Sequence, residues 1–539
     1  MNLNDRTGNV SQRSHVIIVG GGPVGVGLAI DLAQRGVSST LIERRPGMHN
    51  IPRGQNLTQR TLEHFYFWGC VEEVRATRLL PTTVASNGVI AFRSLMNEHW
   101  FCTKGREIVG DYYFQKNDRM PQYCFETEMR KRMAQLPLAQ ARFGWILRSL
   151  DQDASGVRVT VQNEAGDGAT EVLEADYIVG CDGGHSMVRE SSGIKRDGTD
   201  FDQVMMLSVF RSPELNQILG ARFPVCSTYR AVDPALNGYW QFFGRVDMND
   251  TFFFHAPVPG DTTRDNFDFA GLLHKVVGAP FACDFSYVGF WDLKIAVAEE
   301  YRKGRVFIAG DAAHSHPPYG GFGVNNGLED AANLAWKLAA RIHGWAGEDL
   351  LDSYDLERRP VFKDVGENLI AARIKWEGEL SNRHDPAENP EGFKAAWNEL
   401  ETGNGPFVSG FEPNYEGSPI VYGPAGGVSS ARGEYMFKAR AGHHLAPRTL
   451  SNGRNVFEEL GGGFVLFAFD APAGAAEAFE HAASELKIPL KVVRDTFAGG
   501  REDFEARLML IRPDQHVAWT SDVAAADAGA ILRRVAGRA

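Results

Sequence analysis

The sequence predicts an α/β protein of two or three domains, from its length and from two glycine-rich turns that each follow an apolar strand. The chain has 539 residues, too many for one hydrophobic core. The two turns lie at 20–25 and 182–189, while segments near 240–258 alternate apolar and polar residues, as antiparallel strands do. We therefore expect a strand–turn–helix domain with a parallel sheet, interleaved with an antiparallel sheet.

The first turn has the spacing of a dinucleotide-binding turn. Gly20, Gly22 and Gly25 follow a short apolar run and precede a helical stretch. Such glycines allow a tight turn, close approach of a pyrophosphate and close helix–strand packing. A second apolar strand ends at Glu43, whose carboxylate is placed to bind an adenosine ribose. The pattern predicts a Rossmann-type domain that binds a dinucleotide with an unphosphorylated ribose.

The second turn follows the apolar strand 176–180 and has the pattern Asp-Gly-x-x-Ser-x-x-Arg from Asp182 to Arg189. Its residues can form hydrogen bonds to a cofactor, or they can simply stabilise a β-turn. The pattern alone does not decide between the two interpretations, and its position in the order of motifs gives it weight.

Residues 310–338 combine a strand end, a glycine loop and the start of a helix. Asp311 follows an apolar strand, so its carboxylate can bind ribityl or ribose hydroxyls. The loop 317–323 allows the backbone to approach a planar ring. A helical pattern begins at about Asn325, so we expect unpaired N–H groups and a positive dipole just after the glycines. The stretch predicts a site for an anion such as a reduced isoalloxazine.

In this order, the three motifs resemble those of the single-component flavoprotein aromatic hydroxylases over residues 14–370. The resemblance implies FAD as cofactor, NADPH or NADH as reductant and O2 as oxidant. It implies that a flavin C4a-hydroperoxide transfers its distal oxygen to a phenolic ring. The C-terminal third is similar to the thioredoxin-like tail of phenol hydroxylases and polyketide hydroxylases. The expected fold is thus a Rossmann-type FAD-binding domain, an interleaved antiparallel-sheet substrate domain and a thioredoxin-like α/β domain.

The resemblance also predicts the domain boundaries. No cysteine follows Cys283, so the last domain lacks a redox cysteine pair, and packing or a contact in a homodimer is its expected role. We expect an FAD-binding domain at 14–90, 118–195 and 288–370, a substrate domain at 91–117 and 196–287, a helical linker at 371–430 and the thioredoxin-like domain at 431–539.

The cofactor contacts are carried over residue by residue. Arg53 could instead form a surface ion pair, and Gln122 could cap a helix. Backbone N–H groups at 323–325 would face the N1/O2 edge of the flavin, where one donor is worth roughly 3 kcal/mol in comparable sites. Pro318 and Gly323 would lie beside the reacting ring. The expected contacts are Gly20, Gly22, Gly25, Glu43, Arg53, Gln122, Leu147, Asp182, Asp311, Pro318, Gly323, Val324 and Asn325.

The substrate residues are predicted more weakly. Asp118 lies near the place of an acid in some phenol hydroxylases, offset by about one residue, so it is a candidate base or a turn residue. Gln55 stands where several relatives have a histidine. The aromatic stretch 239–255 supplies Tyr239, Trp240 and Phe254, which could line a substrate pocket or form sheet core.

Composition excludes several classes of protein. The net charge of −12, without a basic stripe, argues against nucleic-acid binding. The six cysteines are far apart, so we expect reduced thiols in a cytoplasmic enzyme. The sequence shows neither a signal peptide nor a transmembrane span. His314 and His316 lack further ligands at metal-binding spacing, so we expect no metal and a structural role for His314.

Three functions stay open. We expect a phenol hydroxylase of aromatic catabolism, with a tailoring hydroxylase of aromatic polyketides and a non-catalytic flavin-binding protein as alternatives. The pyridine-nucleotide–disulfide reductases share the first motif, but a second such motif and a redox cysteine pair are absent from the sequence. Neither the aromatic substrate nor the choice between NADH and NADPH can be predicted.

Overall fold

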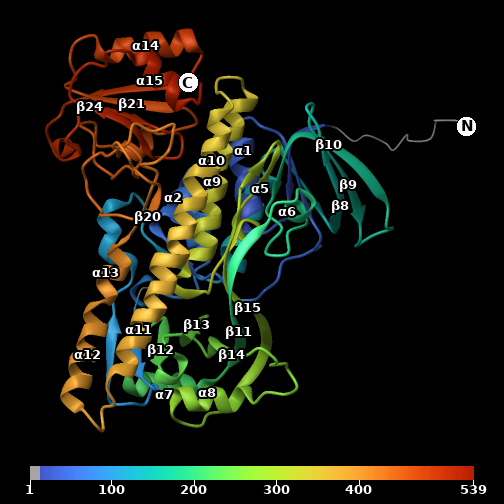
Figure 1. The fold of residues 1–539 in the computed structure, drawn as a ribbon, viewed down its shortest axis with the longest axis vertical. Coiled ribbons are helices and arrows are strands. Elements are labelled where there is room, and N and C mark those ends of the chain that lie inside the picture. Colours follow the sequence, from blue (N-terminus) through green and yellow to red (C-terminus); the bar gives the residue numbers. More distant parts are fainter. Residues whose placement is uncertain (1–12, 86, 539) are drawn as a thin grey trace, which may run out of the picture.

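The computed structural model describes residues 13–85 and 87–538, which form two large sheets, a helical rod and a C-terminal domain (Figure 1). The first sheet has the order β16-β17-β10-β1-β2-β7, and the hairpin β8–β9 extends it through β10. All neighbours from β17 to β7 are parallel. The strands span Ser14–Val19 (β1), Ser39–Glu43 (β2), Ala139–Phe143 (β7), Trp145–Gln152 (β8), Val157–Asn163 (β9), Thr170–Gly180 (β10), Arg302–Lys303 (β16) and Val306–Ile308 (β17).

Two helices that lie far apart in sequence pack together over this sheet. They are α1 (Pro23–Gln34) and α9 (Phe322–Ile342). Helix α5 (Gln122–Ala134) packs against α1 from another side. The inner strands β1, β2 and β17 are almost wholly buried, as expected when helices cover a parallel sheet. The arrangement confirms the predicted Rossmann-type architecture.

The second sheet is mostly antiparallel and has the order β18-β15-β11-β14-β13-β12-β4-β5. Helices α7 (Pro213–Arg222) and α8 (Phe269–Val277) lie along it at the bottom of Figure 1 and complete its apolar core. The strands span Gly88–Phe92 (β4), Trp100–Thr103 (β5), Arg196–Arg211 (β11), Thr228–Val232 (β12), Gln241–Arg245 (β13), Thr251–Pro259 (β14), Asp284–Ala298 (β15) and His314–Ser315 (β18).

Two strands of this sheet cross the expected domain boundaries. Strand β4 begins at Gly88, before the expected boundary at residue 90. Strand β15 continues to Ala298 and pairs with β11 along its length, past the boundary at residue 288. The other boundaries stay predictions.

A long helical rod links the sheets to the C-terminal domain. Helix α10 (Asp349–Asp364) continues through a π-helical stretch, Val365–Ala371, into α11 (Ala372–Arg383). Pro360 lies inside α10. The chain then forms α12 (Pro390–Thr402) and α13 (Asn404–Ser409), drawn in orange in Figure 1.

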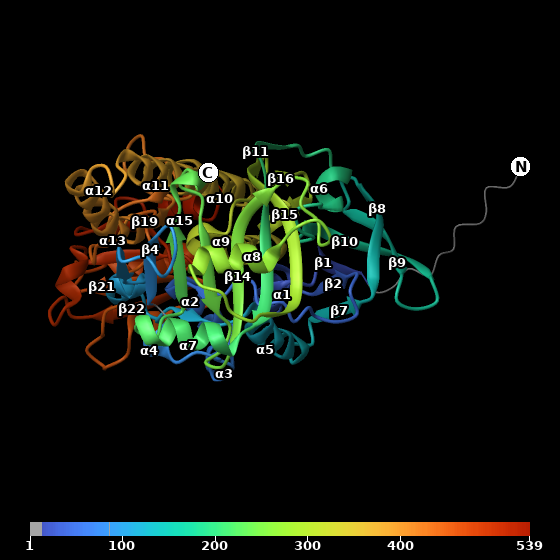
Figure 2. The same ribbon diagram turned by 90° about the horizontal axis from the view of Figure 1, so that it is seen from below.

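The C-terminal domain has a four-stranded sheet of order β22-β21-β23-β24, in which β21 and β22 are parallel and the other pairs antiparallel. Its core also takes in Trp336 and Trp345, so the domain packs on the end of α9. Figure 2 shows this domain and the β8–β9 hairpin at opposite ends of the molecule. The elements are β21 (Phe464–Phe469), α14 (Ala475–Leu486), β22 (Leu490–Asp495), β23 (Leu508–Ile511), β24 (Val517–Ser521) and α15 (Ala528–Val535).

This topology confirms the predicted thioredoxin-like fold. The cysteines within the described ranges are all unpaired. Within the same ranges, no helix has both the length and the apolar character needed to cross a membrane.

Candidate active site

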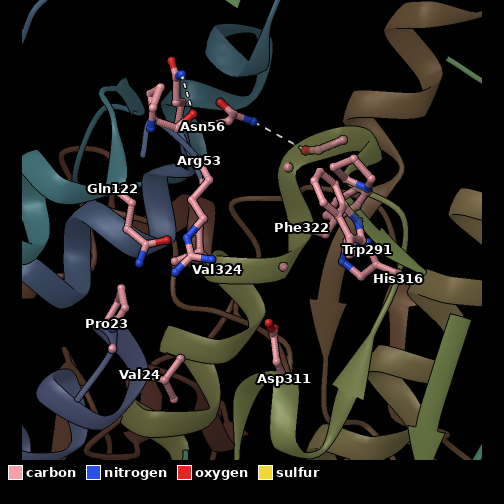
Figure 3. A pocket seen from close by; sticks show the side chains of 18 of the residues that line it. Pro23, Val24, Arg53, Asn56, Gln122, Trp291, Asp311, His316, Phe322 and Val324 are labelled. Atoms are coloured by element: carbon pink, nitrogen blue, oxygen red, sulfur yellow. Dashed lines mark hydrogen bonds between the residues drawn. The ribbon is translucent and has the colours of Figure 1, made fainter. Parts of the chain in front are cut away.

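A cavity of about 860 Å³ lies between the carboxyl ends of the first sheet and one face of the second sheet. Figure 3 shows its wall, to which the turn before α1, the loop before α9 and the strand β15 all contribute. Such an edge of a parallel sheet is where dinucleotides bind in Rossmann-type folds.

The first glycine turn is shaped by backbone contacts. Gly20 has φ of +109°, and a Cβ added there would lie 2.2 Å from the Cys181 carbonyl oxygen. A Cβ on Gly25 would lie 2.0 Å from the Gly20 carbonyl oxygen. Gly22 is different, since no atom lies within 4 Å of an added Cβ and the residue lines the cavity. The turn therefore leaves open space at the uncapped N-terminus of α1, where a pyrophosphate can bind.

Glu43 is oriented by two backbone N–H groups at the end of β2. Its Oε2 accepts a hydrogen bond from Gly21 at 2.6 Å and its Oε1 accepts one from Arg45 at 2.8 Å. The residue is half-buried and lines the cavity. The carboxylate is thus held in place for the hydroxyls of a ribose.

Asp182 lines the cavity, but both carboxylate oxygens are used within its own turn. Oδ1 accepts a hydrogen bond from Ser186 Oγ at 2.5 Å, and Oδ2 accepts one from the Val188 N–H at 3.2 Å. Burial raises the pKa of this carboxyl. Asp182 therefore stabilises the start of α6 (Met187–Ser191) at the edge of the cavity.

Arg53, Gln122 and Leu147 all lie on the cavity wall. Figure 3 shows the Arg53 and Gln122 side chains next to each other, with Val324 beside Arg53. The Gln122 amide donates to Glu126 at 2.9 Å, and its N–H donates to the Arg53 carbonyl at 3.0 Å. Arg53 is exposed and free to contact a cofactor.

The loop before α9 approaches the cavity with its backbone. Asp311 is exposed, and in Figure 3 its side chain extends toward the Arg53 side of the cavity. Gly320 and Gly321 have φ of +72° and +67°, a region that favours glycine. Pro318 precedes them on the wall.

Helix α9 begins at Phe322, three residues earlier than expected. Gly323 and Val324 lie in its first turn and on the cavity wall, so their N–H groups have no partner within the helix. Asn325 comes one residue too late to offer its N–H. At this position of a helix the N–H group bonds within the helix, so the geometry does not favour Asn325 as a donor to the flavin, and that role stays a prediction.

Asn325 instead holds the loop through its side chain. Its Oδ1 accepts hydrogen bonds from the Thr58 N–H at 2.9 Å and from Thr61 Oγ at 2.6 Å. Its Nδ2 donates to the Gly321 carbonyl at 2.6 Å. The residue therefore joins the loop to α2 (Gln59–Phe67) and is not part of the wall.

The two histidines of the loop have different surroundings. His314 is buried, donates to Asp330 at 2.6 Å and stacks on Phe362 at 3.7 Å, as a structural residue would. His316 lines the cavity, and burial lowers its pKa to about 4. Within the described ranges, no three His, Cys, Asp or Glu residues are grouped as metal ligands.

Asp118 is not brought to the cavity. It lies in β6 (Asp118–Arg119), is buried, and accepts a hydrogen bond from Arg78 Nε at 2.5 Å. Its neighbours Asn117 and Arg119 line the cavity, because successive side chains of an extended segment point to opposite sides. The prediction of Asp118 as substrate base is therefore not supported by the geometry.

Of the predicted substrate residues, Gln55 and Trp240 lie on the wall, whereas Tyr239 and Phe254 do not. Tyr239 packs in the apolar cluster around Tyr319. Phe254 is fully buried in the core of the second sheet, 4.6 Å from Phe243. The sequence thus identifies the aromatic stretch, but it does not show which of its side chains face the cavity and which face the core of the sheet.

The opposite face of the same strands supplies residues that the sequence prediction did not include. Phe253 and His255 alternate with Phe254 in β14 and line the cavity, and burial lowers the pKa of His255 to about 3. Arg230 contacts Glu377 at 2.9 Å and lies over the Trp240 ring at 4.3 Å. The sequence shows that side chains of this strand alternate between two faces, but it does not show which of the two faces lines the cavity. Wall residues of the second sheet that lie outside the predicted set include Arg230, Phe242, Phe253, His255 and Trp291.

Comparison with known proteins agrees with this geometry. A family model described as an FAD binding domain matches residues 13–368, and one described as the C-terminal domain of aromatic-ring hydroxylases matches residues 438–539. A putative polyketide hydroxylase from Streptomyces halstedii is 32% identical over 99% of this chain and 94% of its own length.

Two further relatives span nearly the whole chain. A 4-methyl-5-nitrocatechol 5-monooxygenase from a Burkholderia species is 29% identical and covers 96% of each chain. The crystal structure of aklavinone-11 hydroxylase with FAD and aklavinone superposes with a TM-score of 0.80 at 26% identity, over 99% of this chain and 100% of that one.

Proposed function

The chain belongs to the FAD-dependent aromatic hydroxylases, and from this premise we propose that it hydroxylates a phenolic ring with NAD(P)H as reductant and O2 as oxygen source. Flavin-dependent oxidation of aromatic compounds is the activity of the family. The use of NAD(P)H and O2 and the phenolic nature of the substrate are the proposed part.

One observation carries the proposal. A single cavity joins a wall made of backbone groups, suited to a dinucleotide, to a wall of aromatic side chains. The turn at Gly20–Gly25, the carboxylate of Glu43 and the start of α9 fit FAD, since they offer open space, an oriented acceptor and free N–H groups. When bound, FAD would supply electron transfer from NAD(P)H and the activation of O2.

The chain's own residues would bind and orient the substrate ring and would stabilise negative charge on the cofactor. The N–H groups of Gly323 and Val324, with the positive end of the α9 dipole, favour negative charge at the site they face. Trp240, Phe253 and Trp291 present flat apolar surfaces that would hold a ring and exclude water. These roles follow from the positions of the residues on the cavity wall.

Gln55 is the residue we propose to receive the substrate hydroxyl. It is buried on the wall, and its Nε2 donates to the Pro52 carbonyl at 3.1 Å. Its Oε1 accepts no hydrogen bond from the described residues, and a buried acceptor without a partner is costly. A phenolic O–H would satisfy that oxygen. A neutral amide orients the hydroxyl and does not remove its proton.

Two classes of phenolic substrate have support from different relatives. The 4-methyl-5-nitrocatechol monooxygenase points to a single ring in aromatic catabolism. The polyketide hydroxylase and aklavinone-11 hydroxylase point to tailoring of a polycyclic polyketide. The broad aromatic wall favours a flat substrate of either size. The names of these relatives describe enzymes and give no support to a non-catalytic flavin-binding protein.

A substrate panel tests the proposal. Phenols, hydroxybenzoates and polycyclic hydroxyquinones are incubated with the purified protein, and NAD(P)H oxidation is measured separately from hydroxylated product. At least one member should give both. Oxidation without product from every member would contradict the hydroxylase assignment, and a colourless protein that takes up no added FAD would contradict the cofactor.

Asp311→Ala tests the cofactor site separately. The exposed carboxylate at the cavity edge is expected to bind the ribityl or ribose hydroxyls, so the variant should retain little FAD. Flavin absorbance per polypeptide measures the content. A normal FAD content would refute the assignment of Asp311.

A further inference from the structure

Helix α9 carries polar side chains deep inside the protein, on the side toward α10 and the C-terminal domain. Glu329, Asp330, Asn333 and Lys337 are all buried. The same helix begins at the cavity wall, with Gly323 and Val324. A buried charge is tolerated only when countercharges and hydrogen bonds compensate it. The source of these countercharges therefore decides what holds α9 in place.

Asp330 connects α9 to the segment that precedes the cavity loop. Its Oδ2 accepts hydrogen bonds from the Gly310 N–H at 3.0 Å and from His314 Nε2 at 2.6 Å. Its Oδ1 accepts one from Arg358 of α10 at 2.7 Å. Both ends of the Gly310–His314 segment are thus fixed to α9, and a shift of the helix moves the loop.

Further along α9, the countercharge comes from the C-terminal domain. Glu357 of α10 accepts hydrogen bonds from Lys337 Nζ at 2.7 Å and from Arg512 Nη1 and Nη2 at 2.7 and 2.8 Å. Arg512 also donates to Asp514 through Nε at 2.9 Å. Arg512 and Asp514 lie between β23 and β24, and burial lowers the pKa of Lys337 to about 8.

We call Lys337, Glu357, Arg512 and Asp514 the buried charge cluster. All four side chains have an exposed fraction of 0%. Two cations meet two carboxylates, and the C-terminal domain supplies one of each. Arg512 is the cation of the cluster that contacts both carboxylates at hydrogen-bond distance. The neutral amide of Asn333 on α9 also donates to both, to Glu357 at 2.7 Å and to Asp514 at 3.3 Å. The cluster is complete only when that domain is docked.

A second tie runs through Arg60 of α2. Arg60 donates to the Asp514 carbonyl and to Gln515 Oε1, both at 2.7 Å, and to Glu329 Oε2 of α9 at 2.9 Å. The N-terminus of the same helix α2 holds Asn325, which in turn binds the Gly321 carbonyl. The C-terminal domain thus contacts the helix that fixes the last residue of the cavity loop.

We propose that docking of the C-terminal domain and binding of FAD are energetically coupled through two ties, with Arg512 as the positioning residue. The first tie is the buried charge cluster, and the second is the set of hydrogen bonds that Arg60 donates. The domain has no cysteine, so its contribution is charge and packing rather than redox chemistry. Coupling is reciprocal: FAD strengthens docking by the same factor by which docking strengthens FAD binding. This inference rests on the FAD-binding part of the proposed function and is independent of hydroxylation.

Arg512→Met tests the first tie in the full-length protein. The variant leaves Asp514 without its cation, so FAD affinity should fall by roughly 5- to 150-fold. The measurements are the FAD dissociation constant well below the unfolding temperature and the rise in Tm on adding FAD. A variant that only loses stability lowers the Tm of both forms but keeps the dissociation constant and the FAD-induced rise. That outcome would overturn the proposal.

Three matched variants test whether the lost charge of Arg512 causes the loss of FAD affinity. Lys438→Met removes an exposed ion pair with Glu505 in the same domain and should leave FAD binding unchanged. Arg512→Lys keeps the charge and should restore part of the affinity. Arg512→Met combined with Asp514→Asn returns the buried charge cluster to one cation and one carboxylate and should restore more of the affinity than the lysine. Failure of both to restore FAD binding would contradict a charge-based coupling.

Hydrogen exchange of the unaltered protein tests reciprocity without any variant. The Arg512 N–H donates to the His516 carbonyl at 2.8 Å and the Gln515 N–H to the Arg512 carbonyl at 3.0 Å, so both amides report on docking of this turn. Added FAD should slow their exchange, while helix α14 on the same domain should change much less. Equal changes in both regions, or no change, would overturn the coupling. Failure of the protein to bind FAD at all would instead refute the proposed cofactor.

Discussion

The two walls of the cavity are built from different groups of the chain, one mainly from backbone and the other mainly from side chains. The wall toward the first sheet depends on backbone: a turn in which a Cβ on Gly20 or Gly25 would collide with a carbonyl oxygen, and N–H groups at the starts of α1 and α9. The wall toward the second sheet uses side chains that alternate along β13, β14 and β15. A backbone wall tolerates few residues at its turns, whereas a side-chain wall can be changed one residue at a time. The difference predicts different consequences of mutation on the two sides.

The largest effect is expected in the backbone wall, where Gly20→Ala would break the turn. The added Cβ lies 2.2 Å from a carbonyl oxygen, and φ is +109°, so the free energy of unfolding should fall by about 3 kcal/mol or more. Gly22→Ala is the matched control, because its Cβ meets nothing within 4 Å. It should keep the stability and lose FAD. Urea unfolding and flavin content measure the two effects, and equal stability of both alanine variants would contradict this account.

A second prediction concerns Asp118, which lies behind the substrate wall. Asp118→Asn weakens the buried ion pair with Arg78, so stability should fall by about 2 kcal/mol. The pH profile of hydroxylation should not change, because the residue is not on the wall. Thermal unfolding and the pH dependence of kcat/KM are measured together. Loss of an acidic limb from that profile would return Asp118 to the role of a base.

The third prediction uses His255, a titratable group buried in the side-chain wall. Burial lowers its pKa from 6.5 to about 3, so between these values the unfolded chain binds a proton that the folded protein does not. Stability is therefore lost as the pH falls through 6.5. The contribution between pH 8 and pH 5 is about 2 kcal/mol.

His255→Leu should remove that part of the pH dependence. The control is His481→Leu, since His481 is exposed and its pair with Glu485 lies at the surface. Urea unfolding at the two pH values gives the difference for each variant. An unchanged pH dependence in His255→Leu would show that the imidazole titrates equally in both states.

The smallest effect distinguishes the two faces of β14. Phe254→Leu shortens a side chain in the core and should cost about 1 kcal/mol without a change in KM. Phe253→Leu alters the wall and should change KM for an aromatic substrate more than it changes stability. Steady-state kinetics and unfolding of both variants are compared. The reverse pattern would mean that the faces have been assigned wrongly.

The same contrast explains what could be predicted from the sequence. The glycines at 20, 22 and 25 and the acid at the end of β2 follow from local rules of turns and strand ends, and the structure places them on one edge. The thioredoxin-like fold of the C-terminal domain is also confirmed. These features are local in sequence, or they carry motifs that resemble a known family.

The rest depends on contacts between distant segments. Whether Phe253 or Phe254 faces the cavity depends on which face of the sheet α7 and α8 cover, and alternation within β14 gives the period but not the phase. The start of α9 differs from expectation because the apolar pattern marks the buried face of the helix, not its first turn. The contact between Arg512 and Glu357 joins residues separated by 155 positions, and no local sequence pattern indicates it.

The interleaved order of the strands also determines when the protein can fold during synthesis. Helix α1 is complete early, but α9, which packs on it, emerges only after some 300 more residues. At 5–20 residues per second the ribosome takes roughly 15 to 60 s to make that length. Throughout that interval the apolar surface of α1 lacks its final cover. The nascent chain should therefore depend on a holding chaperone more than a protein whose first domain is continuous.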